Sequence, residues 1–265
     1  MIPCNDEEIF QKMCQAHRLW LFLDYDGTLA DFAPTPEVII PDESVISLIH
    51  QLADHPDIQV AIISGRRLGQ LQRLLPVRKV LMAGTYGLEL HFPDGESILR
   101  IKLEKTKPLL VDLKKKWTQL LAGHSDFYLE DKTWTLAIHA KDADEFEAAA
   151  ILQGAREQAE LLMTQDTENL FRLQGGYRFL ECSPRLADKR RTVEYLLSAI
   201  PHSDDTLLIY LGDDDKDEVA FSLIQEYGGV VGSVGERLKN SGADFWLPSP
   251  QAVRHCLQAV VAARN

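Results

Sequence analysis

The stretch Leu19-Trp20-Leu21-Phe22-Leu23-Asp24-Tyr25-Asp26-Gly27-Thr28-Leu29 decides the fold of this chain. Its five leading apolar residues are few for a helix and suit a strand that is buried on both faces of a parallel sheet. The strand then ends in two carboxylates, Asp24 and Asp26, at the edge where open α/β sheets bind ligands. Because buried carboxylates are costly unless they are paired or bind a metal, the motif predicts a phosphoryl-transfer site.

Two other interpretations compete with a phosphoryl-transfer site at this motif. An isolated Asp-x-Asp is usually a solvated strand end. A calcium-binding loop requires glycine at its sixth position and glutamate at its twelfth, whereas here Gly27 is fourth and Thr35 is twelfth. The calcium-loop interpretation is therefore excluded.

Composition limits the partners of the chain. Its 265 residues are 45% hydrophobic, with 40 acidic against 28 basic side chains and a formal net charge of -12. This charge argues against nucleic acid or an anionic membrane as the main partner. A small molecule is the expected partner. The sequence leaves the oligomeric state open, with a monomer favoured.

Compartment signals point to the cytoplasm. The four cysteines form no Cys-x-x-Cys pair, so zinc is not expected. The amino terminus lacks the features of a secretory signal, and no run approaches the ~20 apolar residues of a membrane span. We expect a soluble cytoplasmic protein.

Further strands repeat the pattern of the first. Apolar runs predict strands over Ile58–Ile63, 79–83, Thr206–Leu211, 230–231 and 245–247. Helical spacing predicts helices over 6–17, 41–55, 68–75, 187–199, 219–226 and from 250 onward. This alternation predicts a doubly wound, Rossmann-like α/β core with a parallel sheet.

The alternation is interrupted in the middle of the chain. Residues 88–101 read as a β-hairpin around Pro93-Asp94-Gly95. Helices are then expected over 105–122 and 143–159, and strands over 127–130, 134–139, 160–164, 169–173 and 177–182. We interpret residues 104–182 as an inserted α+β cap domain, and residues 1–103 with 183–265 as the catalytic core.

Polar residues follow several core strands. Asp24 and Asp26 follow the first strand, Ser64 follows the second, and the run Gly212-Asp213-Asp214-Asp215-Lys216-Asp217 follows the strand that ends at Leu211. Because these strand ends share one sheet edge, the side chains should converge. Carboxylates around a hard divalent cation favour magnesium as the cofactor.

The four motifs Asp24-Tyr25-Asp26-Gly27-Thr28, Ser64, Lys189 and Gly212-Asp213-Asp214 resemble those of the haloacid dehalogenase superfamily of phosphatases. Ala33-Pro34-Thr35-Pro36, Ser64-Gly65-Arg66, Ala83-Gly84-Thr85 and Asp217-Glu218 further resemble trehalose-6-phosphate phosphatases. The resemblance covers the whole chain, including the position of the insertion.

This resemblance implies a role for each matching residue. Asp24 would attack phosphorus to form an aspartyl-phosphate, and Asp26 would act first as general acid and then as general base. Ser64 and Lys189 would bind the phosphoryl oxygens, and Thr28, Gly65 and Arg66 would contact the substrate. Magnesium would be held by Asp24, the Asp26 backbone carbonyl and Asp213, with Asp214 or Asp217 orienting a bound water.

In the cap, the resemblance points to Glu130, Lys132 and Glu181 as groups that bind sugar hydroxyls. The chain departs from the family pattern at four places, namely Tyr86, Ala140-Lys141, Ser183 and Lys216. These departures leave the chemistry intact and bear on which sugar is recognised.

The sequence therefore leaves three functions open. The first is a magnesium-dependent phosphatase of trehalose 6-phosphate, and the second is a phosphatase of another glycosyl phosphate, of the sucrose or glucosylglycerol type. The third is a regulatory or binding module without catalysis, against which stands the presence of both Asp24 and Asp26.

Overall fold

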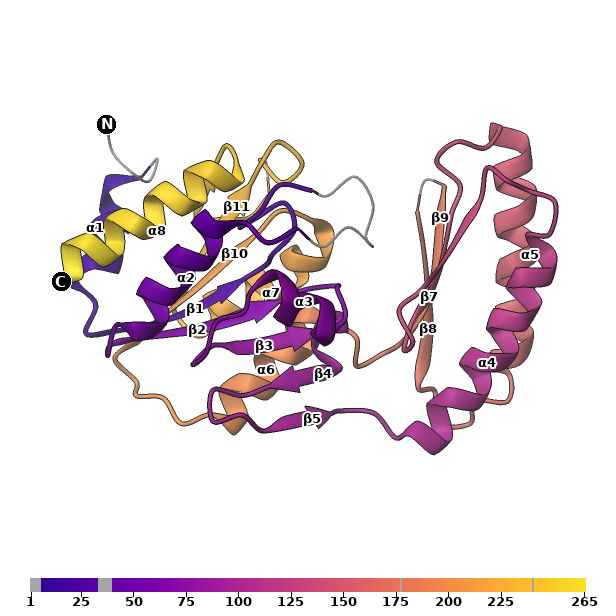
Figure 1. The fold of residues 1–265 in the computed structure, drawn as a ribbon, viewed down its shortest axis with the longest axis horizontal. Coiled ribbons are helices and arrows are strands. Elements are labelled where there is room, and N and C mark those ends of the chain that lie inside the picture. The colour runs from indigo at the N-terminus through magenta and orange to yellow at the C-terminus, as the bar shows by residue number, and fades with distance from the viewer. Residues whose placement is uncertain (1–5, 33–39, 177, 240) are drawn as a thin grey trace. The chain divides into compact units, whose positions relative to one another are not determined.

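A computed structural model describes residues 6–32, 40–176, 178–239 and 241–265 (Figure 1). The chain divides into two compact units. Met1–Leu99 together with Asp188–Asn265 form the core unit, and Arg100–Ala187 form the cap unit. The family-like segment Ala33-Pro34-Thr35-Pro36 lies outside the described residues.

The core unit is built on an eight-stranded sheet in the order β12-β11-β10-β1-β2-β3-β4-β5. Six strands are parallel, namely β1 (Arg18–Leu23), β2 (Ile58–Ile63), β3 (Leu81–Gly84), β10 (Thr206–Gly212), β11 (Val230–Val234) and β12 (Phe245–Leu247). The edge strands β4 (Glu89–His91) and β5 (Ser97–Leu99) run antiparallel. The first strand of the sequence therefore occupies the middle of the sheet, between β10 and β2.

Helices cover both faces of this sheet (Figure 1). One face packs against α1 (Glu7–Gln15), α2 (Glu43–Asp54), α3 (Leu68–Leu74) and α8 (Pro250–Arg264), and the other against α6 (Lys189–Ala199) and α7 (Asp215–Glu226). Alternate side chains of β1 face opposite ways, since Leu21 belongs to the first apolar cluster and Phe22 to the second. The expectation of a doubly wound α/β core is confirmed.

Helix α7 begins at Asp215, four residues before the expected start at 219. Its capping residue is Asp214, whose side chain accepts hydrogen bonds from the backbone N–H groups of Lys216 and Asp217. Such a cap satisfies donors that the first helical turn leaves without partners. The acidic loop is therefore largely the first turn of a helix.

The cap unit combines a four-stranded antiparallel sheet with two long helices. Its strands lie in the order β6-β7-β9-β8, with β6 (Tyr128–Asp131), β7 (Leu136–His139), β8 (Phe171–Gly176) and β9 (Phe179–Pro184). Helices α4 (Leu103–Leu120) and α5 (Glu145–Met163) pack on one face through Trp117, Ala155 and Ile138. The insertion is thus α+β, as expected.

The strand expected over 160–164 is wrong, because these residues form the last turn of α5 and the turn that follows it. The short apolar run Leu161-Leu162-Met163 resembles a strand only in isolation. Buried Ala148, Ala155 and Ala159 continue a helical spacing into it. The helix is therefore stabilised by packing that begins far upstream of the run.

None of the described helices combines the length and apolar character that crossing a bilayer requires.

Candidate active site

The parallel pairing of β1 and β10 brings two distant carboxylates together. Leu23 and Leu211 are partners in register, and the backbone N–H of Asp24 donates to the carbonyl of Leu211 at 3.0 Å. Asp24 follows β1 directly, and Asp213 follows β10 directly. Both side chains therefore leave the same edge of the core sheet.

Lys189 links these strand ends to α7. As the first residue of α6, it follows the capping residue Asp188, and its side chain is only 3% exposed. Its Nζ donates to Oδ1 of Asp24 at 2.7 Å and to Oδ1 of Asp217 at 2.5 Å. The ammonium group thus bridges Asp24, which follows β1, and Asp217, in the first turn of α7.

Burial and crowding shift the titration of this network. Burial raises the pKa of Asp24 to about 7 against the opposing effect of Lys189, and burial with the charge of Asp217 raises the pKa of Asp213 to about 7. Burial alone would lower the pKa of Lys189, but the carboxylates of Asp217 and Asp24 raise it well above the ordinary value. The lysine therefore stays charged, while the carboxylates crowded around it keep protons at pH values at which a solvated aspartate is ionised.

This crowding of carboxylates around one ammonium group suits a cation. Ligand oxygens of Asp24, Asp213 and Asp217 lie within 4.8 Å of one another, and all three residues are buried. Three carboxylates facing one ammonium group are costly to bury unless a proton or a metal ion joins them. An all-oxygen donor set fits magnesium better than zinc.

Two glycines allow these carboxylates to approach the backbone. Gly27 has a φ of +85°, and a Cβ at this position would lie 2.4 Å from Oδ2 of Asp213. A Cβ on Gly212 would lie 2.3 Å from Cβ of Asp217. No other residue type fits either position without displacing a member of the site.

Asp26 and Arg66 form a separate pair. Nε of Arg66 donates to Oδ2 of Asp26 and Nη2 donates to Oδ1, each at 2.7 Å. The side chain of Asp26 is 22% exposed and that of Arg66 is 8% exposed. The structure therefore pairs Asp26 of the Asp24-Tyr25-Asp26-Gly27-Thr28 motif with Arg66 of the Ser64-Gly65-Arg66 motif.

The remaining core residues expected at the site also lie at these strand ends, where Thr28 and Ser64 are buried. Thr28 donates from Oγ1 to Oδ1 of Asp213 at 3.4 Å, and the Oγ of Ser64 accepts from the backbone N–H of Arg66 at 3.1 Å. The backbone of Gly65 lies against the ring of Tyr86, since a Cβ there would be 2.8 Å from it. Asp214 differs from the others, because its side chain caps α7.

Sequence reasoning missed Tyr210, a fully buried residue of β10 whose hydroxyl donates to Oδ1 of Asp217 at 2.7 Å. A tyrosine inside a buried strand is itself a signal, because its hydroxyl needs a partner there. The departures Tyr86 and Lys216 also pair with each other, with Nζ of Lys216 2.7 Å from the hydroxyl of Tyr86. This contact joins the loop after β3 to the start of α7.

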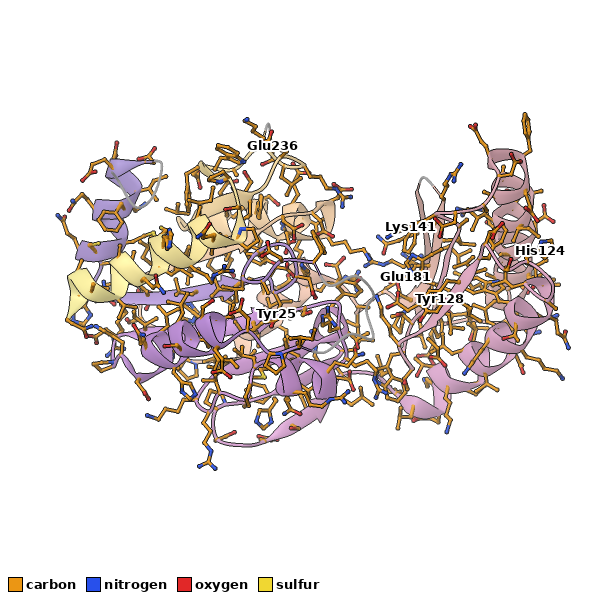
Figure 2. All side chains as sticks on the ribbon, turned by 45° about the horizontal axis from the view of Figure 1, so that its top comes forward. Tyr25, His124, Tyr128, Lys141, Glu181 and Glu236 are labelled. Atoms are coloured by element: carbon orange, nitrogen blue, oxygen red, sulfur yellow. The ribbon has the colours of Figure 1, made fainter. Side chains whose placement is uncertain are left out.

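In the cap unit, the sheet register places Glu130 and Glu181 on one cross-strand row, on either side of Ala137. This row alternates with Leu129, Ile138 and Leu180, which pack toward the helices. Figure 2 shows Glu181 and Tyr128 on the strands of this unit and His124 beside its helices. The row therefore belongs to the sheet face that α4 and α5 leave uncovered.

The charges on this row are not ordinary solvated surface charges. Glu130 is 7% exposed and Glu181 is 2% exposed. Oε2 of Glu130 lies 3.0 Å from Nε2 of His139 and 3.4 Å from Nζ of Lys132. Burial opposes ionisation of Glu130, but His139 and Lys132 hold its pKa below the ordinary value. The row thus carries an ionised, hydrogen-bonded carboxylate.

Comparison with known proteins agrees with this arrangement. The family model described as trehalose-phosphatase matches residues 22–244. The probable trehalose-phosphate phosphatase C of Arabidopsis thaliana is 27% identical over 269 residues, covering 96% of this chain and 80% of that protein. The trehalose-phosphate phosphatase of Mycobacterium bovis BCG is 27% identical over 238 residues, covering 88% of this chain and 59% of that protein.

A solved structure has the same fold. The C-terminal domain of trehalose-6-phosphate phosphatase from C. albicans superimposes with a TM-score of 0.79 at 20% identity, covering 97% of each chain. This likeness shows the fold, while the family match spans most of the sequence and includes the strand-end motifs. The chain belongs to the trehalose-phosphatase family.

Proposed function

We propose that this protein hydrolyses trehalose 6-phosphate to trehalose and phosphate with the help of magnesium. The observation that carries the proposal is the contact of Asp24 with Lys189 beside the buried carboxylates of Asp213 and Asp217. Family membership supports the substrate, because relatives that match most of this chain are named for it. The net charge of -12 repels an anionic substrate, so the substrate needs the local positive charge that magnesium would supply.

In the first step, an oxygen of Asp24 attacks phosphorus, and the bond from phosphorus to the sugar oxygen breaks. A proton on Asp26 moves to the departing oxygen, so the sugar leaves as an alcohol and Asp26 becomes a carboxylate. The product on the protein is an aspartyl-phosphate. Splitting the displacement in this way replaces one difficult step by two easier ones.

In the second step, the carboxylate of Asp26 takes a proton from water, and the water oxygen attacks phosphorus. The bond from phosphorus to Asp24 breaks, which releases phosphate and restores the Asp24 carboxylate. Asp26 again carries its proton, so the cycle closes. The same side chain serves as acid and base because the second step reverses the direction of the first.

Charge on the phosphoryl oxygens must be stabilised through both steps. We propose that Lys189, Ser64 and Thr28, which are buried near the strand ends that carry the carboxylates, contribute together with the backbone of Gly65. Magnesium would be held by Asp24, Asp213 and the Asp26 carbonyl, with Asp214 or Asp217 beside it, and would neutralise phosphoryl charge when bound.

For the sugar, we propose contacts from Glu130, Lys132 and Glu181. The burial of Glu130 and Glu181 on the face of the cap sheet opposite α4 and α5 supports this, because charged groups are rarely buried without a partner or a function, and Lys132 contacts Glu130. A phosphate dianion does not cross a bilayer unaided, so the enzyme would work in the compartment where its substrate is made. We propose that this compartment is the cytoplasm.

Two other functions make different predictions. A phosphatase of another glycosyl phosphate would keep the same core site and differ at the cap. A binding module without catalysis would have the same fold but no chemical need for both Asp24 and Asp26.

The test is phosphate release from a panel of sugar phosphates, measured with magnesium and with excess chelator. We expect trehalose 6-phosphate to give the highest kcat/KM and the chelator to abolish turnover. Preference for sucrose 6-phosphate or glucosylglycerol phosphate would replace the substrate, and absence of release from every ester would favour the binding module.

A further inference from the structure

The pairing of Arg66 with Asp26 suggests a role for the arginine beyond charge balance. Two donors of one guanidinium meet the two oxygens of one carboxylate, each at 2.7 Å. A single hydrogen bond lets a carboxylate rotate about its last side-chain bond, whereas this fork fixes the plane of the group. The orientation of Asp26 is therefore set by Arg66.

The backbone of Arg66 is itself held firmly. Its N–H donates to Oγ of Ser64 at 3.1 Å, and its carbonyl accepts from the N–H of Thr85 at 2.7 Å. The residue before it, Gly65, packs against the ring of Tyr86. With the guanidinium side chain 8% exposed, the pair differs from a solvated surface ion pair, which fixes little.

The fork also leaves capacity for chemistry. An ionised carboxylate has about four lone-pair positions, of which the two donors of Arg66 occupy two. A proton, a water or a sugar oxygen can still meet Asp26 at the others. The arginine thus constrains the group without blocking it.

We propose that Arg66 is a positioning residue that orients Asp26 for proton transfer, in place of the direct substrate contact expected for it. The inference rests on the proposed function, since it needs Asp26 to give its proton to the sugar oxygen as the phosphorus–oxygen bond breaks. Arg66 takes no part in the bond changes. It fixes the oxygen from which the proton leaves and to which the proton of water returns.

The leaving group separates this role from phosphate binding. A sugar alkoxide is a poor leaving group and requires the proton of Asp26, whereas p-nitrophenolate leaves without one. The ratio kcat/KM reports events up to the first phosphoryl transfer. A residue that acts through Asp26 should therefore matter for the sugar ester and not for p-nitrophenyl phosphate.

The experiment compares Arg66→Lys, which keeps the charge and removes the fork, with Asp26→Asn and the double variant. We expect Arg66→Lys to lower kcat/KM for trehalose 6-phosphate about ten- to a hundredfold, as part of the ~10²–10⁴-fold contribution of a general acid. On p-nitrophenyl phosphate the change should stay within about threefold. In the Asp26→Asn background, Arg66→Lys should add less than about threefold on either ester, because the two residues act as one unit.

Arg67→Lys is the matched control, because Arg67 is the next residue, is 42% exposed and contacts Glu89 at 3.6 Å. It should leave both esters unaffected. Equal losses on both esters in Arg66→Lys, or losses that simply multiply with those of Asp26→Asn, would overturn the proposal and assign Arg66 to the phosphoryl group.

A second variant and a second measurement test the same proposal independently. If Arg66→Lys does not fold, as judged from its circular dichroism and thermal unfolding, Arg66→Gln is read in the same way, and rates on both esters are compared only for protein that unfolds cooperatively like the parent. Across aryl phosphates with successively poorer leaving groups, the rates of the variant should fall more steeply than those of the parent, and parallel slopes would overturn the proposal. If the parent prefers another sugar phosphate, the proposed substrate fails, yet the same comparison on that ester still tests Arg66.

Discussion

The ammonium nitrogen of Lys189 lies 2.7 Å from Oδ1 of Asp24, inside a network that is almost closed to solvent. A nucleophilic carboxylate has to be ionised, and burial works against this by raising the pKa of Asp24 to about 7. The lysine is the cation on this chain that directly opposes the effect. The contact therefore connects folding of the core unit with ionisation of Asp24, the proposed nucleophile.

The first prediction concerns the replacement of Asp24, the proposed nucleophile. Asp24→Asn keeps the shape of the side chain and removes the attacking charge, so turnover should fall by several orders of magnitude, about the loss seen when covalent nucleophiles are removed. Rapid acid quench should trap phosphorylated parent protein and none of the variant.

The control for this variant is Asp215→Asn, which removes an exposed carboxylate at the start of α7 that pairs with Arg237 at 2.7 Å. It should keep parental turnover and unfold at the parental temperature. Turnover of Asp24→Asn within about tenfold of the parent would remove Asp24 from the role of nucleophile.

The second prediction concerns pH and metal. The pKa of Asp24 and of Asp213 is raised to about 7 in the folded protein, so the folded state holds protons that the unfolded state has already lost. Stability of the metal-free protein should therefore fall as pH rises from about 4 to about 7. Magnesium binds the deprotonated carboxylates, so its stabilising effect should grow over the same interval.

Thermal unfolding with and without magnesium, at about pH 5 and about pH 8, measures this difference directly. We expect a larger increase in Tm at the higher pH, and a much smaller one in Asp213→Asn. An equal increase at both pH values, or an unchanged increase in Asp213→Asn, would contradict the assignment of the metal to these carboxylates.

Tyr210 provides the third prediction. Its hydroxyl donates to Asp217, so Tyr210→Phe leaves a buried carboxylate with one donor fewer and should cost about 1–3 kcal/mol of unfolding free energy. Urea unfolding gives this value, and Tyr227→Phe, at a tyrosine that is 58% exposed, is the control that should cost nothing. A stability loss no greater than that of the control would mean that Asp217 does not depend on this hydroxyl.

The strand-end convergence could be predicted from the sequence because it needs only two facts. Apolar runs such as Leu19–Leu23 identify buried strands, and parallel strands share one edge. These facts bring Asp24 and Asp213 together without knowledge of any side-chain contact. The pattern of apolar residues is strong enough for this purpose because the central strands β1 and β10 are buried on both faces.

Contacts between loops could not be predicted in the same way. The fork of Arg66 on Asp26 and the bond from Lys216 to Tyr86 depend on where flexible side chains end in three dimensions, which a residue pattern does not encode. The strand expected over 160–164 failed for a related reason. Its apolar residues are ambiguous locally, and the packing of α5 against the cap sheet decided their structure.

The last prediction concerns recognition of the sugar. Glu130, which is buried on the face of the cap sheet opposite α4 and α5, pairs with the partly exposed Lys132, and His139 contacts the same carboxylate. Loss of a hydrogen bond to a sugar hydroxyl leaves its partner unpaired and commonly costs about 1–3 kcal/mol. Glu130→Ala and Lys132→Ala should therefore each lower kcat/KM for trehalose 6-phosphate by roughly ten- to a hundredfold, while p-nitrophenyl phosphate, which lacks the sugar, is hydrolysed nearly as before.

Glu147→Ala, which removes a half-exposed carboxylate of α5 that pairs with His124 at 2.6 Å, is the control within the same unit and should change neither rate. Equal losses on both esters would assign the pair to folding of the cap, and parental rates on both would exclude these side chains from recognition of the sugar.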